Sequence, residues 1–368
     1  MLKKYNIPEK TRIVVLERKG KISLKEVPVM HPKSGWDLIK VGACGICGSD
    51  VRYYFGENPW ALHTLGINEP MPANSVLGHE VAGTIVEVGD LENESRIGER
   101  VGIIAFDTCK KCYYCRRSLH NLCENTLHVG HDSRWKGWDY NPGGYADYML
   151  IWDDKAHAIP DNISFVEATQ LDGLAVAVHA NNRGNVKTGD NVLVLGLGAI
   201  GQMVSQVAKA RGALKVIGAD IWEKPLEIAS KIGVDVIVNS KKEDLLKIVM
   251  NETNNIGANV VFDTVGTAES FMVGMKALAR AGTYVLLAVS EEEVKIPLTF
   301  FAGERVVTTS ANNLFPEYTT AVELLSSGRV KVKPFITHVF KLSEVYEAFK
   351  IAVNKEEYDA IKVVLVPD

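Results

Sequence analysis

The stretch NVLVLGLGAIGQMVSQVAKARG, residues 191–212, contains the pattern that decides the fold. It begins with a short apolar run that predicts a buried strand, and it continues from residue 199 with apolar residues at helical spacing. The turn between them has G-x-G-x-x-G spacing and consists of Gly196, Leu197, Gly198, Ala199, Ile200 and Gly201. Because these glycines follow a strand and open a helix, they predict a turn whose backbone N–H groups bind the pyrophosphate of a dinucleotide. A glycine-rich turn without a ligand is the alternative interpretation.

The residue that ends the next predicted strand, KVIGAD at 215–220, indicates which dinucleotide binds. Asp220 stands about 20 residues beyond the glycine-rich turn, as the acidic residue of dinucleotide-binding units does. A carboxylate there can accept hydrogen bonds from both ribose hydroxyls, and its charge repels the 2′-phosphate of NADP. We therefore expect NAD as the cofactor.

Strands and helices continue to alternate on the C-terminal side of this unit. Apolar runs at 215–220, 234–239 and 258–263 are separated by helix-like segments, which predicts parallel βαβ units with a buried sheet. Residues 11–106, in contrast, contain short β segments punctuated by glycines. The tail from about residue 313 returns to mixed helix and strand. The sequence therefore predicts an α/β protein with a β-rich domain, a doubly wound α/β domain and a C-terminal return.

The charge balance limits the possible partners. The chain has 41 Lys and Arg against 45 Asp and Glu, for a net charge of -4, which gives no electrostatic support for binding nucleic acid or an anionic membrane. The first residues, MLKKYNIPEK, are not followed by the apolar segment of a secretory signal. No uninterrupted apolar run reaches the about 18 residues that a membrane helix needs. We therefore expect a cytoplasmic protein whose thiols stay reduced.

Four of the six cysteines are crowded into DTCKKCYYCRRSLHNLC, residues 107–123. They follow the pattern C-x2-C-x2-C-x7-C and are Cys109, Cys112, Cys115 and Cys123. A flexible loop with this spacing can surround one zinc ion tetrahedrally, with Zn–S distances of about 2.3 Å and no position open for water. Disulfides are disfavoured in a reducing compartment. An iron–sulfur cluster is disfavoured because the fourth cysteine is distant and no proline follows it. We expect a structural zinc site.

A second metal constellation combines Cys47 in GICGSD with His79 and Glu80 in LGHE. These few side chains are weak evidence alone, because a buried cysteine and a core histidine would look the same. A catalytic zinc needs three protein ligands and one exchangeable position. Asp172, at the head of the apolar stretch TQLDGLAVAVHA, can supply the third ligand or act as a helix N-cap. Glu80 is either a ligand itself or a hydrogen-bonding partner of one.

Taken together, these motifs resemble the zinc-containing medium-chain dehydrogenases and reductases, in family order along nearly the whole chain. CGICGSDVRYY (44–54) and LGHEVAGTIVEVG (77–89) look most like the polyol (sorbitol) and L-threonine dehydrogenase branches. In those branches a carboxylate at the position of Asp172 is the third zinc ligand. The resemblance also implies two zinc ions per chain and a homodimer or homotetramer. The domains that it implies are a GroES-like β-barrel catalytic domain at 1–157 with a zinc lobe at 109–123, a Rossmann NAD-binding domain at 158–312, and a return to the catalytic domain at 313–368.

The resemblance implies oxidation of a secondary alcohol of a polyol or sugar to the ketone, by hydride transfer to NAD. Zinc polarises the substrate hydroxyl, Ser49 accepts its proton, and Asp50 orients a zinc ligand unless it is an ordinary turn residue. The stretch HDSRWKGWDYN (131–141) offers polar groups and indole faces that suit a hydroxyl-rich ligand, unless these aromatics merely pack the domain surface. His131 within it is a candidate for substrate contact.

Two features depart from the resemblance. Arg52 stands where many relatives have a histidine that conducts the substrate proton to solvent, and the segment between Cys47 and His79 is longer than usual. Oxidation of an L-threonine-like amino alcohol is the alternative reaction, since Arg52 could recognise a carboxylate. A zinc-free quinone or enoyl reductase is less consistent, because it needs neither Cys47 nor His79. The alternative from another class is a non-catalytic protein that keeps zinc and NAD binding on the same fold.

Overall fold

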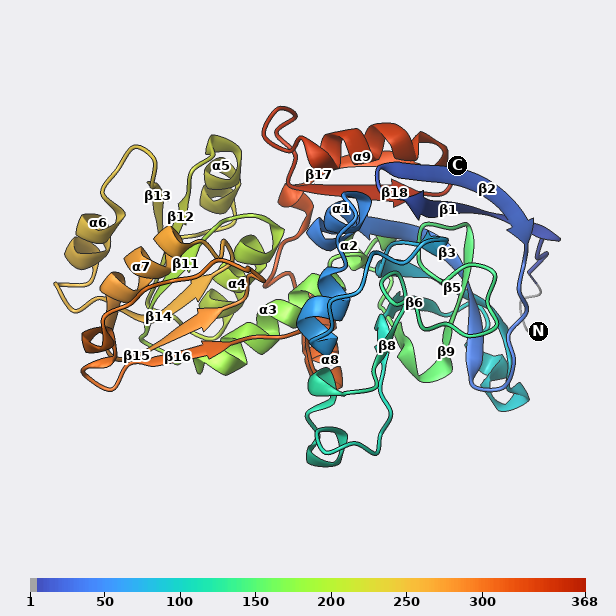
Figure 1. Cartoon of the computed structure of the whole chain (residues 1–368), viewed down its shortest axis with the longest axis horizontal. Helices are drawn as coiled ribbons and strands as arrows, with labels where there is room; N and C mark the ends of the chain where they lie inside the picture. The colour runs from blue at the N-terminus through green and yellow to red at the C-terminus, as the bar shows by residue number, and fades with distance from the viewer. Residues whose placement is uncertain (1–4) are drawn as a thin grey trace. The chain divides into compact units, whose positions relative to one another are not determined.

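The computed structural model describes residues 5–368, which divide into two compact units (Figure 1). The first unit runs up to Asp172 and resumes at Ile336. The second unit consists of Gly173–Phe335. The chain thus leaves the first unit once, forms the second, and returns.

The second unit is built on a six-stranded parallel sheet with the order β13-β12-β11-β14-β15-β16. Helix α4 packs against β11 and β12, α5 packs against β12 and β13, and α7 packs against β14 and β15 (Figure 1). This strand order is that of dinucleotide-binding α/β domains, so the predicted doubly wound sheet is confirmed. Its elements are α3 (Leu171–Gly184), β11 (Asn191–Leu195), α4 (Ala199–Ala210), β12 (Lys215–Asp220), α5 (Glu223–Lys231), β13 (Val236–Asn239), α6 (Leu245–Glu252), β14 (Ala258–Asp263), α7 (Ala268–Ala277), β15 (Leu278–Leu286), β16 (Val306–Thr309) and α8 (Phe315–Ser326).

The sequence of the central strand explains its place in the sheet. Val192, Leu193 and Val194 of β11 are fully buried, as expected for a parallel strand that is covered on both faces. Strand β11 ends at Leu195, and α4 begins at Ala199 after Gly198 as the N-cap. The predicted strand–turn–helix unit is therefore present at the predicted residues.

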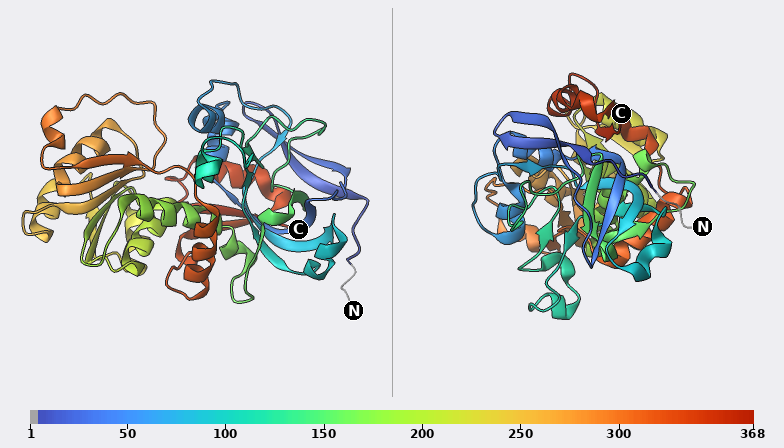
Figure 2. Two further views of the ribbon diagram at one scale, coloured as in Figure 1. Left: turned by 90° about the horizontal axis from the view of Figure 1, so that it is seen from below. Right: turned by 90° about the vertical axis from the view of Figure 1, so that its right-hand side faces the viewer.

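The first unit is built on a seven-stranded, largely antiparallel sheet. Its main path is β10-β6-β5-β3-β18-β17, and β9 also pairs with β3. The C-terminal strand β18 pairs with β3, so early and late segments of the chain share one sheet (Figure 2). The smaller sheets are β2-β1-β4 and β7-β8. The elements are β1 (Lys10–Arg18), β2 (Lys21–Pro28), β3 (Trp36–Ile46), α1 (Gly48–Tyr54), β4 (Ser75–Val76), β5 (Glu80–Val88), β6 (Arg100–Ile103), β7 (Phe106–Asp107), β8 (Leu127–His128), β9 (Tyr148–Trp152), β10 (Ala156–Ala158), α2 (Phe165–Ala168), β17 (Ile336–Lys341), α9 (Val345–Val353) and β18 (Lys362–Val366).

The boundaries of the two units differ from those predicted after residues 157 and 312. Residues up to Asp172 stay with the first unit because α2 packs against β3 and β5. Helix α8 stays with the second unit because its buried Glu317 accepts a hydrogen bond from His179 of α3 at 3.0 Å. The chain therefore returns to the first unit only at Ile336.

None of the helices described in residues 5–368 has the length and apolar character that crossing a lipid bilayer requires. The longest of them, α3, has 14 residues, whereas a membrane-spanning helix needs about 20.

Candidate active site and metal centres

The four clustered cysteines lie in the loop between β7 and β8, which projects from the rest of the first unit (Figure 1). Their sulfur atoms lie within 4.8 Å of one another, and Cys109 Sγ is 4.0 Å from Cys115 Sγ. Four thiolates at about 2.3 Å from a zinc ion would lie about 3.8 Å apart, so the observed spacing fits zinc. All six cysteines of the chain are free, so no disulfide competes for these sulfur atoms.

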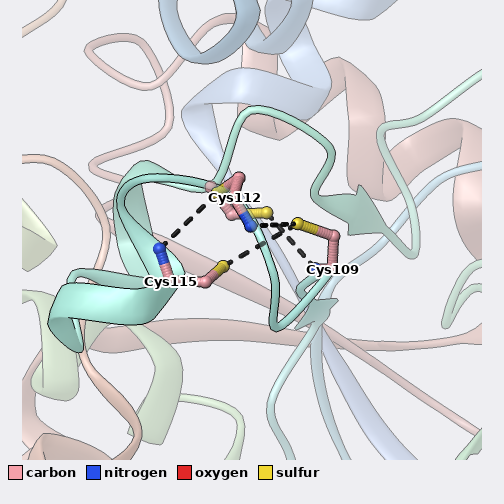
Figure 3. A group of neighbouring side chains, drawn as sticks. Cys109, Cys112 and Cys115 are labelled. Atoms are coloured by element: carbon pink, nitrogen blue, oxygen red, sulfur yellow. Dashed lines mark hydrogen bonds between the residues drawn. The ribbon is translucent and has the colours of Figure 1, made fainter.

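Backbone N–H groups point at the sulfur atoms of this cluster. Cys112 N–H donates to Cys109 Sγ at 3.3 Å, and Cys115 N–H donates to Cys112 Sγ at 3.5 Å (Figure 3). Such bonds favour the thiolate, and the N–H of Lys111, with others, lowers the pKa of Cys109 to about 6. Burial raises the pKa of Cys123 to about 12. A bound cation is therefore needed to keep all four sulfur atoms as thiolates at neutral pH.

Replacement Cys115→Ser is expected to lower the zinc content from two ions per chain to one and to destabilise the first unit by on the order of 3 kcal/mol. The reason is that three thiolates hold the metal more weakly, and the loop then loses the ion that orders it. Elemental analysis and calorimetry measure the two effects. Tyr113→Ser, which changes a side chain that is 58% exposed in the same loop, is the control and should keep both ions. Two zinc ions in the Cys115→Ser protein would contradict the assignment.

A second cluster of metal-binding side chains forms at the ends of β3 and β5. Cys47 is the N-cap residue of α1, His79 directly precedes β5, and Glu80 is the first residue of that strand. Their ligand atoms lie within 4.8 Å of one another, and His79 and Glu80 are 5% and 4% exposed. A thiolate, an imidazole and a carboxylate that leave one position open match the donor set of a catalytic zinc. These residues therefore fit a second zinc ion.

The protonation of His79 links zinc binding to pH. Burial lowers the pKa of His79, but its hydrogen bond with Cys47 and the charges of Cys47, Asp50 and Asp172 raise it to about 10. Without a metal the imidazole is therefore protonated at neutral pH. Zinc binds the neutral imidazole, so metal binding releases a proton and weakens as the pH falls.

A buried lysine that the sequence did not single out holds Glu80. Lys362 is the first residue of β18, and its Nζ lies 2.6 Å and 2.7 Å from the two carboxylate oxygens of Glu80. Strand β3 lies between β18 and β5, and its Gly45 is paired with Glu80. A Cβ on Gly45 would lie 2.1 Å from Glu80 Oε2. The missing side chain at Gly45 therefore lets the Glu80 carboxylate extend over the middle strand to Lys362.

Asp50 is placed to orient His79. One of its carboxylate oxygens accepts hydrogen bonds from Cys47 N–H and from the Tyr145 hydroxyl, both at 2.8 Å. The other oxygen lies 3.8 Å from His79 Nδ1. Asp50 is completely buried, and burial raises its pKa although His79 lowers it. Metal-binding histidines commonly donate their second N–H to a carboxylate, so the geometry supports the orienting role expected of Asp50. Tyr145 is a further member of this site that the sequence did not indicate.

Asp172, the second residue of α3, lies close to this cluster but outside it. Burial raises the pKa of Asp172 to about 6, while the charge of His79 lowers it and that of Glu80 raises it. Two groups of three metal-binding donors within residues 5–368 include His79. One adds Cys47 and Glu80, the other adds Asp50 and His131, and Asp172 belongs to neither group. The geometry therefore favours Glu80, the alternative ligand, over Asp172 as the direct third donor. A role of Asp172 as a ligand through a bridging water stays a prediction.

Buried aromatic side chains surround the metal cluster. Ser49 Oγ lies 3.1 Å from His131 Nε2, and the His131 ring centre is 4.2 Å from that of His79 and 4.4 Å from that of His128. Trp60, from the long segment before β4, lies 6.1 Å from His128. His131, expected as a substrate contact, therefore belongs to the immediate surroundings of the metal ligands.

The indole side chains of residues 131–141 pack against other tryptophan rings. Trp135 is 8% exposed, and its ring centre lies 6.1 Å from that of Trp36 and 5.5 Å from that of Trp138. These rings pack against one another in the first unit, so the packing interpretation holds for them. They give no support to sugar stacking.

In the second unit, the glycine-rich turn connects β11 to α4. Gly196 has a φ of +84°, which favours glycine, and a Cβ on Gly201 would lie 1.9 Å from the Gly196 carbonyl oxygen. Apart from Gly198 and its two chain neighbours, no atom of residues 5–368 lies within 4 Å of the place where a Cβ of Gly198 would be, which leaves space for an anionic ligand at the N-terminus of α4. Asp220, at the end of β12, accepts a hydrogen bond from Leu197 N–H at 2.7 Å and so lies beside the turn. The arrangement fits the pyrophosphate and ribose of NAD.

Comparison with known proteins covers both units. The family model described as zinc-binding dehydrogenase matches residues 199–327, and the alcohol dehydrogenase GroES-like domain matches residues 33–161. L-Threonine 3-dehydrogenase of Pyrococcus abyssi is 33% identical over 89% of this chain and 91% of its own. Sorbitol dehydrogenase of Bacillus subtilis is 27% identical over 99% of both chains. The structure of an Escherichia coli CFT073 alcohol dehydrogenase, solved with NADH, superimposes with a TM-score of 0.85 at 25% identity over 98% of this chain and 100% of that one.

These similarities agree with the sites described above. The GroES-like match contains both cysteine-bearing metal clusters, and the zinc-binding dehydrogenase match begins within the glycine-rich turn. Zinc and NAD(H) are accordingly the cofactors, and the reaction is an oxidoreduction at a CH–OH group. The chain belongs to the zinc-containing medium-chain alcohol dehydrogenases.

Proposed function

We propose that the chain oxidises a secondary alcohol group of a polyol or a sugar to the ketone, with NAD+ as the hydride acceptor. The observation that carries this proposal is the carboxylate of Glu80 beside Cys47 and His79. At the position of the family's third zinc ligand the chain carries another carboxylate, Asp172, as the polyol and L-threonine branches do, whereas alcohol-dehydrogenase relatives use a second cysteine. The similarity to a sorbitol dehydrogenase over 99% of both chains supports the same substrate class.

The residues of the first unit can perform the steps that such an oxidation requires. Zinc, when bound, supplies a Lewis acid that lowers the pKa of the substrate hydroxyl, and NAD+ supplies the hydride acceptor. Cys47, His79 and Glu80 hold the ion and leave one position for the substrate oxygen. Asp50 fixes the orientation of the His79 ring. Ser49 Oγ accepts the hydrogen bond of the substrate hydroxyl and, as it receives that proton, passes its own hydroxyl proton outward.

A substrate panel tests this proposal. We expect kcat/KM with NAD+ to be at least about 10-fold higher for the best of several polyols and sugars than for L-threonine. Primary aliphatic alcohols should be poorer still. A clear preference for ethanol would contradict the polyol assignment, and a clear preference for L-threonine would favour the second candidate below.

Oxidation of an L-threonine-like amino alcohol is the second candidate. It is supported by the 33% identity to L-threonine 3-dehydrogenase of Pyrococcus abyssi and by Arg52, a cation that could recognise a carboxylate. Arg52 Nε, however, lies 2.5 Å from Glu57 Oε2, so its charge already has a partner. For this reason the polyol proposal ranks first.

We expect the enzyme to prefer NAD+ to NADP+ by at least about 100-fold in kcat/KM, because like charges brought together at a binding site are unfavourable by several kcal/mol. Asp220 is the source of this preference. Replacement Asp220→Ser removes the repulsion of the 2′-phosphate and should reduce the ratio to below about 10-fold. Kinetics with both cofactors measure the change, and Asp235→Ser, on the loop before β13, is a control that should keep the wild-type ratio. Equal use of the two cofactors by the wild type would contradict the role of Asp220.

The homodimer or homotetramer that the resemblance implies stays a prediction. It is compatible with β16, one of the two edge strands of the six-stranded sheet, where Val306 is 51% exposed. Such an edge can pair with a strand of another chain.

A further inference from the structure

The hydrogen bond between Ser49 and His131 joins two segments that are far apart in the sequence. Ser49 lies in α1 and His131 follows β8, and Ser49 Oγ is 3.1 Å from His131 Nε2. The His131 side chain is 8% exposed. Its other ring nitrogen, Nδ1, has no hydrogen-bond partner within residues 5–368. Ser49 is therefore the hydrogen-bond partner of this ring within the described residues, and its hydroxyl can either donate to Nε2 or accept from it.

The position of His131 relative to the metal cluster is fixed by the backbone beside it. A Cβ on Gly130 would lie 2.6 Å from the carbonyl oxygen of Gly78, so the loop before His131 packs directly on the residue before His79. Gly130 N–H also donates to Pro142 O at 2.7 Å. The His131 ring also packs against the rings of His79 and His128, whose centres lie 4.2 Å and 4.4 Å from its own. The imidazole is therefore a rigid partner for Ser49.

The Ser49 hydroxyl carries a single hydrogen, and its direction matters for the reaction. If this hydrogen pointed to the substrate oxygen, Ser49 could not accept the hydrogen bond of the substrate hydroxyl. An acceptor on another residue that takes the hydrogen of the Ser49 hydroxyl removes this conflict. Arg52, in the same helix, cannot be that acceptor because a guanidinium has only donors, and its Nε is bound to Glu57. His131 Nε2 is within reach and can accept.

We propose that His131 is a positioning residue, which accepts the Ser49 O–H at Nε2 and so turns the lone pairs of Ser49 Oγ towards the substrate hydroxyl. This inference rests on the proposed function. It requires the neutral His131 tautomer that carries its proton on Nδ1. His128 does not have this role. Its Nδ1 lies 2.7 Å from the carbonyl oxygen of Val129, so a backbone contact fixes the orientation of its ring.

Four variants test the inference by kinetics: His131→Asn, His131→Gln, Ser49→Ala and the double variant Ser49→Ala/His131→Asn. Glutamine can place an acceptor near the position of Nε2, whereas asparagine reaches only to that of Nδ1. We therefore expect His131→Asn to lower kcat by about 10–100-fold with KM changed by less than about 3-fold, and His131→Gln to recover most of the loss. In the Ser49→Ala background, His131→Asn should lower kcat by less than about 3-fold, because its effect passes through Ser49. Equal losses in both backgrounds, or an unchanged kcat in His131→Asn, would overturn the proposal.

A measurement without turnover separates this inference from the proposed function. In ¹⁵N-histidine spectra of the zinc-loaded enzyme, without substrate or cofactor, Nε2 of His131 should be the unprotonated ring nitrogen. Its signal is identified by its loss in His131→Asn and should shift in Ser49→Ala. A protonated Nε2, or no shift in Ser49→Ala, overturns the inference even if polyols are oxidised. A wild type that oxidises no secondary alcohol refutes the proposed function, while the spectrum still decides whether His131 accepts from Ser49. Zinc content and the thermal unfolding midpoint of each variant must match those of the wild type.

Discussion

Replacement Lys362→Met is expected to destabilise the first unit by about 3–5 kcal/mol, because it leaves the buried carboxylate of Glu80 without its ion-pair partner. Lys362 and Glu80 are 6% and 4% exposed, and the Lys362 Nζ contacts both carboxylate oxygens. The thermal unfolding midpoint should fall by on the order of 10 °C. The effect should be largest after zinc has been removed by chelation, since a bound cation next to Glu80 replaces part of the lost charge.

A double variant and the pH dependence of stability determine whether the Lys362–Glu80 pair is responsible. Lys362→Met combined with Glu80→Gln should be more stable than Lys362→Met alone, because no unpaired charge remains buried. The pH dependence gives a second check. Burial lowers the pKa of Lys362, but Glu80 and its other charged neighbours raise it, so that it ends above the usual 10.5. The contribution of the charged Lys362 to the free energy of unfolding is therefore complete at neutral pH. It is lost only as the pH rises above 10.5 through the raised pKa. A destabilisation that is the same with and without Glu80 would contradict this account.

The parts of the molecule that depend on local sequence could be predicted. The glycine-rich turn was predictable because strand β11, Gly196, Gly201 and helix α4 are consecutive in the chain, and each glycine meets a steric requirement of its neighbours. The four-cysteine loop was predictable for the same reason, since its spacing alone brings the sulfur atoms around one ion. Both patterns are short, and their chemistry is contained within the segment itself.

The remaining parts of the catalytic site depend on strand neighbours that spacing does not show. Lys362 lies 282 residues from Glu80, and they meet because β3 between them carries Gly45 at the crossing point. Tyr145 lies 95 residues from Asp50. The choice between Asp172 and Glu80 as third donor was open for the same reason, because both are carboxylates on apolar elements. Only the distances to Cys47 and His79 separate them.

Replacement Cys47→Ala is expected to remove the catalytic zinc and to lower kcat/KM by at least about 1000-fold, which corresponds to about 4 kcal/mol of lost transition-state stabilisation. The physical reason is that His79 and Glu80 alone offer only two donors, one fewer than a catalytic zinc needs. Elemental analysis should find one zinc ion per chain, held by the loop cysteines. The unfolding midpoint should change little, because Cys47 is the N-cap residue of α1 and is only partly buried.

Cys44 provides the matched control for this experiment. It lies three residues earlier, on β3, is 1% exposed, and is absent from both metal clusters of the described residues. Cys44→Ala makes the same chemical change as Cys47→Ala, but it removes a thiol that is packed in the core. It should therefore reduce stability, while two zinc ions and most of the activity remain. The two variants thus separate the role of a thiolate as ligand from its role in packing. An active Cys47→Ala protein with two zinc ions would mean that another donor completes the site, either Asp172 or one of the donors grouped with His79, Asp50 and His131. A loss of zinc in Cys44→Ala would mean that the strand geometry of β3, rather than the ligand itself, holds the metal in place.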